Sequence, residues 1–427
     1  MIDSQASLDW LSKRAGLNLR YFLTSGSWVA GRYVLMGLLS LGISVAFARL
    51  GTAELYGQYQ FVLAVVSFLS ILSLPGLNTV TLIAVAKGIP RVLVDATRVC
   101  FRASWLASAF IVLVGLYYLA VKNQPGIGWS LMGGSTLVPF VYGPNGWYTY
   151  YEGQKDFRAP TKRILLTNGL IALLLLVGLW QDWPLPTLVL SYLFVYAATS
   201  VYFYSEIRKK IHETTPTKIN LRAGILYTLQ KSSSTLPDTL QPVVISSLLG
   251  FGTLGIFMIA YTLVNSASGL ISALSATYFP LLLQYKKLIH RRIILQMLGL
   301  GVVLAAAYWL FVTLLFVPLY SERFLESFRL AQYFSVAVAL MPLKLYFSSY
   351  FTAHNAPELV IRANIISYLL ALIVFLLIGT TNFIASLVGY YVALQLAAVF
   401  ILGFAYFRIV YMGSIGSSSQ NSKNNIA

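Results

Sequence analysis

Residues 57–83 have the sequence GQYQFVLAVVSFLSILSLPGLNTVTLI, an apolar run without a charged side chain. A helix needs about 20 mostly apolar residues to cross the hydrocarbon core of a bilayer, so this run is long enough to span one. The whole chain shares its character: 58% of the 427 residues are hydrophobic, 10% are charged, and the mean hydropathy is +0.75. Soluble domains carry about 25% charged residues. The composition therefore predicts an integral membrane protein and excludes a cytosolic enzyme and a disordered chain.

Similar apolar stretches recur along the chain, so we predict about twelve membrane-spanning helices and an all-α fold. They cover residues 26–48, 57–83, 99–121, 129–151, 163–181, 185–205, 224–249, 253–279, 293–317, 329–352, 361–379 and 383–407. The connections between them are too short for a folded soluble domain. Residues 1–25 are predicted to form an amphipathic cytoplasmic segment, and the low-complexity residues 409–427 a disordered cytoplasmic tail.

Basic residues are concentrated in every second loop. Lys87 and Arg91 lie between the second and third predicted spans, and residues 206–222 form a basic central linker. The alternate loops carry only Arg49, Lys122, Arg323 and Arg329. Because basic loops stay in the cytoplasm, both termini are predicted to be cytoplasmic. This topology accounts for most of the formal net charge of +17, and we expect no nucleic-acid partner.

The two halves of the chain resemble each other. Leu50-Gly51 ends the first predicted span as Leu249-Gly250 ends the seventh, and Pro139 breaks the fourth as Pro342 breaks the tenth. A repeat of six spans gives both halves the same orientation, which is typical of transporters with a cavity between two bundles. We therefore predict an N-lobe over residues 26–205 and a C-lobe over residues 223–408, joined by the linker at 206–222.

The seventh span carries a polar stretch, QKSSSTLPDTLQP, at residues 230–242. If this stretch were a loop, the chain would have one span fewer. The basic cluster at 286–292 would then face outward, against the charge rule. We therefore predict a span that faces an aqueous cavity.

Three segments resemble polysaccharide and O-antigen flippases of the Wzx type, which share a superfamily with MATE antiporters and lipid II flippases. The first is FARLGTAELYGQYQFVLAVVSFLSILSLPGLNTV (47–80), in which a span ends in Arg-Leu-Gly and Tyr-Gly-x-Tyr opens the next. The others are PDTLQPVVISSLLGFGTLGIFMIAYTL (237–263) and MPLKLYFSSYFTAHN (341–355).

This resemblance implies a MATE-like fold with two six-helix lobes around a cationic central lumen. It also implies a function: an undecaprenyl-diphosphate-linked oligosaccharide is flipped from the cytoplasmic to the outer leaflet of the bacterial inner membrane by alternating access. The implied partners are this lipid-linked substrate, membrane lipid and a polysaccharide polymerase or ligase. One chain contains both lobes, so a monomer suffices.

Four ionisable side chains fall inside the predicted spans: Arg32, Lys231, Asp238 and Lys344. A charge at the centre of a spanning helix costs about 2.5–3.5 kcal/mol on insertion scales, so these groups should face a cavity or pair inside the protein. The bases outnumber the acid, which favours an anionic diphosphate head group. We predict that Arg32, Lys231 and Lys344 contact the substrate. Asp238 is predicted to couple an ion or to pair with Arg32 or Lys344. Alternatively, each charge lies near an interface and snorkels to water.

Two neutral polar residues complete the predicted site. Gln241 and Asn265 lie close to these charges in the sequence and could bind sugar hydroxyls, or alternatively join helices by hydrogen bonds. The aromatic residues Tyr142, Trp147 and Tyr151 are predicted to form an interfacial belt rather than a sugar-stacking surface.

Two other functions stay open at this stage. A MATE-type cation or drug antiporter would share the fold but would need an acidic lumen. A membrane enzyme of polysaccharide assembly would need a carboxylate pair, a catalytic histidine or a large polar loop. His212, His290 and His354 have no metal-ligand spacing, Cys100 is the single cysteine, and there is no Walker-type motif. We therefore predict no catalytic residue, no metal site and no cofactor.

Overall fold

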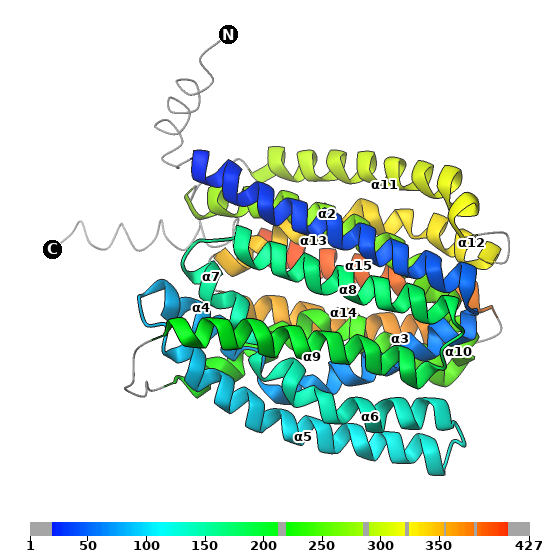
Figure 1. Ribbon diagram of the computed structural model, residues 1–427. Helices are drawn as coiled ribbons and strands as arrows, with labels where there is room; N and C mark the ends of the chain where they lie inside the picture. The colour runs from blue at the N-terminus through cyan, green and yellow to red at the C-terminus, as the bar shows by residue number, and fades with distance from the viewer. Residues whose placement is uncertain are drawn as a thin grey trace, which may run out of the picture. The chain divides into compact units, whose positions relative to one another are not determined.

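Helices form every regular element of the computed structural model, which describes residues 19–211, 219–284, 290–320, 324–353, 356–379 and 382–408 (Figure 1). Nine of the helices in these ranges are long and apolar enough to cross a membrane, or ten when the bent pair α12–α13 counts as one span. The chain is therefore a multi-pass membrane protein. Residues 1–18 of the predicted amphipathic segment lie outside the described residues, as does the whole predicted tail, residues 409–427.

The chain divides into two units, residues 1–273 with 317–327, and residues 274–316 with 328–427. The division into lobes at the linker 206–222 stays a prediction. In chain order the helices of the first unit are α2 (Leu19–Leu50), α3 (Ala53–Leu69), α4 (Leu77–Ala86), α5 (Val92–Ala120), α6 (Pro125–Tyr142), α7 (Trp147–Gly153), α8 (Arg158–Trp180), α9 (Leu185–Lys210) and most of α10 (Leu221–Gln284).

The first unit is held together by extensive pairing of its helices. α5 packs along α6, α6 along α9, and α2 along α8 (Figure 1). Trp147 and Tyr151 of α7 are buried against Phe203 and Ile207 of α9. The predicted interfacial belt is therefore wrong for Trp147 and Tyr151, because the turn after α6 directs these rings into the protein interior.

α10 contains two helical legs that meet at Gly250. The backbone stays helical on both sides, and Gly250 alone has a non-helical conformation, with φ 86° and ψ 169°. A positive φ of this kind is accessible to glycine at little cost. The polar stretch 230–242 lies inside the first leg, so it is helix and not loop. The seventh and eighth predicted spans are thus two legs of one continuous element.

Two of the predicted spans are interrupted or end early in the structure. The second is interrupted after the short 3₁₀ helix η1 (Ser70–Ser73), where Leu74 takes a positive φ before α4 begins. The fourth ends at Tyr142, and a 3₁₀ turn η2 (Pro144–Gly146) separates it from α7. Pro139 and Pro342 do not break their helices, because proline is tolerated in a membrane helix when neighbours satisfy the freed backbone groups.

The second unit contains most of α11 (His290–Tyr320) together with α12 (Leu325–Tyr333), α13 (Ser335–Ala353), α14 (Pro357–Ile378) and α15 (Phe383–Phe407). α14 packs along α15, and α13 lies against both. Tyr346, Phe347 and Tyr406 are central to a buried aromatic core between α13 and α15. α12 and α13 are bent by 41° at their junction and form the tenth span together.

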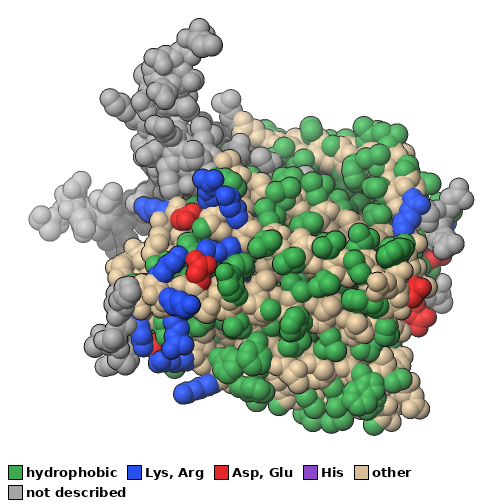
Figure 2. Space-filling model, in the orientation of Figure 1, with side chains coloured by type: hydrophobic (Ala, Val, Ile, Leu, Met, Phe, Trp, Pro, Cys, Tyr) green, Lys and Arg blue, Asp and Glu red, His purple; other side chains and the backbone are tan. Residues whose placement is uncertain are grey.

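The surface matches this membrane assignment. Figure 2 shows the visible flank covered mainly by hydrophobic side chains, while Lys and Arg gather at the end of the first unit where α7 ends and α8 begins. Large exposed apolar residues on this unit include Leu113 at 60%, Trp180 at 74% and Phe194 at 62% exposure. Side chains of this kind are stable at a surface that faces lipid.

Candidate functional site

A charged pair inside the first unit joins α2 to α7. Arg32 donates through Nη1 to Glu152 Oε1 at 3.1 Å, and both side chains are mostly buried, with 18% and 15% exposure. Arg32 also lies 5.8 Å from the centroid of the Tyr33 ring. The carboxylate that pairs with Arg32 is thus Glu152, where the sequence had offered Asp238 as a candidate.

Asp238 instead links the two legs of α10. Tyr261 on the second leg donates its hydroxyl hydrogen to Asp238 Oδ1 on the first leg. This bond spans the turn at Gly250 and fixes the legs against each other. It keeps the carboxylate in a defined position on the polar face of α10.

The other predicted residues of α10 lie in different environments. Lys231 is exposed and has no ion-pair partner among the described residues. Asn265 on the second leg is exposed as well. Gln241 is buried at 2% exposure, and its Nε2 has no hydrogen-bond partner in the described part of the chain. Gln241 therefore offers a buried donor, whereas Lys231 and Asn265 are accessible.

Lys344 belongs to the second unit. It lies in α13 near Pro342 and is half-buried. Five of the six predicted residues thus belong to the first unit, on α2 and α10, and Lys344 belongs to a helix of the other unit. Among the described residues, no hydrogen bond or ion pair joins Arg32 to the predicted residues of α10.

A tyrosine cluster lies next to the start of α3 and was missed from the sequence. The ring of Tyr59 on α3 meets Tyr192 edge-on at 6.4 Å, and Tyr192 stacks on Tyr196 at 6.2 Å. Tyr56 shares a hydrogen bond of 3.2 Å with Thr262 of α10. The spacing of Tyr192 and Tyr196, four residues apart on α9, was the available signal, because such residues share a helix face.

This arrangement favours binding over covalent chemistry. Guanidinium and ammonium groups bind phosphate oxygens. Tyr56 and Tyr59 are buried, whereas Tyr192 and Tyr196 are partly exposed, and partly exposed tyrosine rings suit polyhydroxylated ligands. Within the described ranges, no three His, Cys, Asp or Glu residues are grouped as a metal site would require.

Comparisons with known proteins identify the fold. No protein-family model matches the sequence, and no curated protein matches it. Among solved structures, the chain is similar to an inward-facing multidrug resistance MATE family transporter of the MOP superfamily, with a TM-score of 0.65 and 16% identity over 90% of this chain and 96% of that chain. The chain has the MATE fold.

Two further MATE structures agree with this assignment. A Vibrio cholerae MATE transporter gives a TM-score of 0.59 at 14% identity, covering 90% of this chain and 98% of that chain. The eukaryotic MATE transporter AtDTX14 gives 0.58 at 12% identity, covering 91% and 96%. The likeness extends over nearly the whole of each chain, so the fold assignment applies to both units.

Proposed function

We propose that this chain is a transporter of the MOP superfamily that flips an undecaprenyl-diphosphate-linked oligosaccharide across the bacterial inner membrane, with both termini in the cytoplasm. One observation carries the proposal: a MATE fold whose predicted spans contain Arg32, Lys231 and Lys344. The resemblance of residues 47–80 and 237–263 to Wzx-type flippases supports the same substrate class.

The balance of charge favours an anionic head group. Three bases lie in the predicted spans, and the acids near them are Asp238 and Glu152. Glu152 is engaged by Arg32, and Asp238 accepts a hydrogen bond from Tyr261. Lys231 is exposed without an ion-pair partner among the described residues. In a low-dielectric lumen this charge attracts a diphosphate.

The Arg32–Glu152 ion pair suggests how the diphosphate head group binds. A guanidinium can hold a phosphate through two parallel N–H···O bonds, while its contact with Glu152 is a single bond of 3.1 Å. A diphosphate therefore competes with Glu152 for Arg32 when it enters. Release of Glu152 removes this ion pair between α2 and α7, which would couple head-group binding to the packing of the two helices.

In this proposal the sugars contact neutral polar and aromatic groups. Asn265, which is exposed, and the unpaired Nε2 of Gln241 bind sugar hydroxyls, and the partly exposed rings of Tyr192 and Tyr196 on α9 pack against the sugars. A polymerase or ligase receives the flipped product, the transporter works as a monomer, and no cofactor takes part.

A MATE-type cation or drug antiporter is the second candidate. Asp238 is the observation that favours it, since a carboxylate inside a span can bind a proton or a cation. Two of the similar solved structures are multidrug resistance MATE family transporters. For an antiporter, Asp238→Asn would abolish export of cationic compounds and leave surface glycan unchanged.

The test is flipping of a labelled lipid-linked oligosaccharide in proteoliposomes. The triple variant Arg32→Gln, Lys231→Gln, Lys344→Gln should lose flipping while it is expressed and purified normally. Its matched control removes the same formal charge from exposed positions outside the predicted site, through Lys87→Gln, Lys155→Gln and Lys162→Gln. Full activity in the first variant, or equal loss in both, would reject the proposal.

A further inference from the structure

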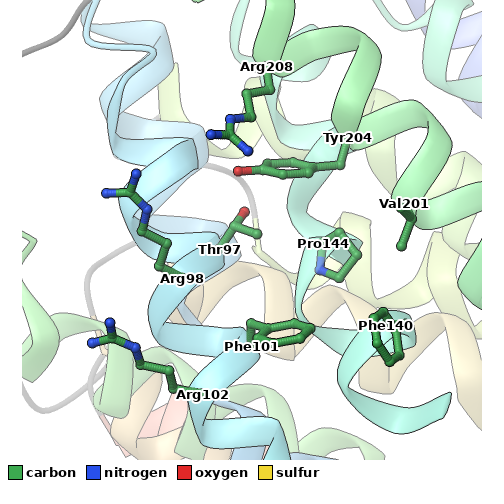
Figure 3. Close-up of a pocket in the computed structure, with 9 residues that line it drawn as sticks. All are labelled: Thr97, Arg98, Phe101, Arg102, Phe140, Pro144, Val201, Tyr204 and Arg208. Carbon is green, nitrogen blue, oxygen red and sulfur yellow. The ribbon is translucent and has the colours of Figure 1, made fainter.

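A pocket with a basic rim opens on the first unit between α5, α6 and α9 (Figure 3). Its volume is about 340 Å³, and its lining combines arginines, aromatic rings and hydroxyl groups. Arg98 and Arg102 project from α5, one helical turn apart, and Arg208 lies near the end of α9 above the ring of Tyr204. None of these residues belongs to the site on α2 and α10.

The pocket keeps an excess of positive charge. Arg98 pairs with Asp95 at 3.4 Å, and the same carboxylate is 3.6 Å from Arg91. Arg102 and Arg208 have no carboxylate partner among the described residues. Asp95 thus serves two guanidinium groups, and Arg102 and Arg208 are left to attract an incoming anion.

One wall of the pocket is apolar and partly exposed. Phe101 and Phe140 meet edge-on at 5.6 Å, and Pro144 and Val201 complete the wall. Phe140 and Val201 are each 41% exposed. Trp105, one turn further along α5, is 52% exposed and touches Phe101 edge-on at 6.2 Å. The apolar surface therefore continues from the pocket along the flank of the unit, in the direction of the hydrocarbon core.

The combination of these groups suits one kind of ligand. Arg208 lies near the end of α9 beside the hydroxyl groups of Thr97 and Tyr204. Arg102 follows Phe101 along α5, where exposed hydrocarbon continues to Trp105. A phospholipid likewise combines an anionic phosphate with acyl chains. A free anion in water would gain nothing from the exposed rings.

We propose that this pocket binds an anionic phospholipid from the leaflet that the basic loops face. Arg102 and Arg208 attract the phosphate, and the acyl chain runs along Phe140 and Val201. Basic pockets between membrane helices on the cytoplasmic side are suited to such head groups. The inference rests on the pocket alone and does not depend on which substrate the transporter carries.

The experiment measures lipid binding to the full-length purified chain by native mass spectrometry. The probes are phosphatidylglycerol and phosphatidylcholine with identical acyl chains. Each Arg near an anionic head group contributes about 1 kcal/mol, so Arg102→Gln with Arg208→Gln should weaken phosphatidylglycerol binding about 30-fold. Lys87→Gln with Lys162→Gln, which are exposed and do not line the pocket, should leave it unchanged.

Two further arms separate a lipid site from an ion site. Phe140→Ser should weaken phosphatidylglycerol binding, and inorganic phosphate should displace the lipid only at a concentration far above that of the lipid, because it makes no contact with the apolar wall. Equal binding of the two lipids by the wild type, equal loss in the two double variants, or displacement of phosphatidylglycerol by an equal concentration of inorganic phosphate would each overturn the inference. Lipid selectivity that is lost only in the arginine variant supports it.

Discussion

Gly57 and Gly255 mark the place where α3 and the second leg of α10 cross with their backbones in contact. A Cβ on Gly255 would lie 1.8 Å from the carbonyl oxygen of Ala53, and a Cβ on Gly57 would lie 1.9 Å from that of Phe251. Both obstacles are backbone atoms, which cannot rotate away as a side chain can. Gly255→Ala therefore forces the two helices apart.

The size of the effect follows from these distances. A carbon and a carbonyl oxygen approach to about 3.3 Å without repulsion, so the helices must separate by about 1.5 Å at this point. Overpacking of this kind costs about 1–3 kcal/mol. For a protein larger than 150–250 residues we expect the thermal midpoint to fall by about 2–5 °C.

The assay is thermal unfolding of the purified protein in detergent, with Gly252→Ala as the matched control. Gly252 lies on the same helical leg, and a Cβ there would have no neighbour within 4 Å. This control should match or slightly exceed the wild type, because alanine favours a helix over glycine by up to about 1 kcal/mol. The double variant Gly57→Ala with Gly255→Ala should lose less than the sum of the two single losses, since the first substitution already opens the crossing.

The reasoning is refuted if Gly255→Ala has the same thermal midpoint as the Gly252→Ala control and the wild type. Strict additivity of the two substitutions would also count against it, because independent sites add and a shared contact does not.

The remaining predictions concern buried polar contacts. Glu152→Gln removes the partner of Arg32 and should destabilise the protein by about 1–2 kcal/mol, and a double-mutant cycle with Arg32→Gln should show coupling. Tyr320→Phe removes the buried 2.6 Å bond to Ser44 and should cost about 1 kcal/mol in the thermal unfolding assay. Thr228→Val leaves the buried backbone N–H of Gly76, at the start of α4, without its acceptor at 2.9 Å and should cost about 1–3 kcal/mol of stability. Thr228→Ser keeps the hydroxyl group and should retain most of the stability. Equal losses in the two variants would contradict a role for the hydroxyl group.

Hydropathy predicted the membrane class and most spans, because a helix in lipid must be apolar over a fixed length whatever its neighbours are. Span ends were predicted less well where local chemistry decides them. Leu74 takes a positive φ that no propensity favours, and the fourth span stops at a Gly143-Pro144 turn and not at the end of the aromatic run. The break in α10 at Gly250 was predictable, because Leu249-Gly250 is the dipeptide that matches Leu50-Gly51 at the end of the first span.

The sequence by itself determined that the chain spans a membrane as helices, that its basic loops alternate, and that ionisable groups lie within the spans. These properties depend on each segment's own transfer from water to lipid. Only the tertiary structure decided that Arg32 pairs with Glu152, that Tyr261 bonds Asp238, and that three arginines of α5 and α9 surround one pocket. The partners in these contacts come from distant parts of the chain, and composition alone would allow many other pairings. The packing of the helices, which depends on the shapes of their side chains, decides which pairs form.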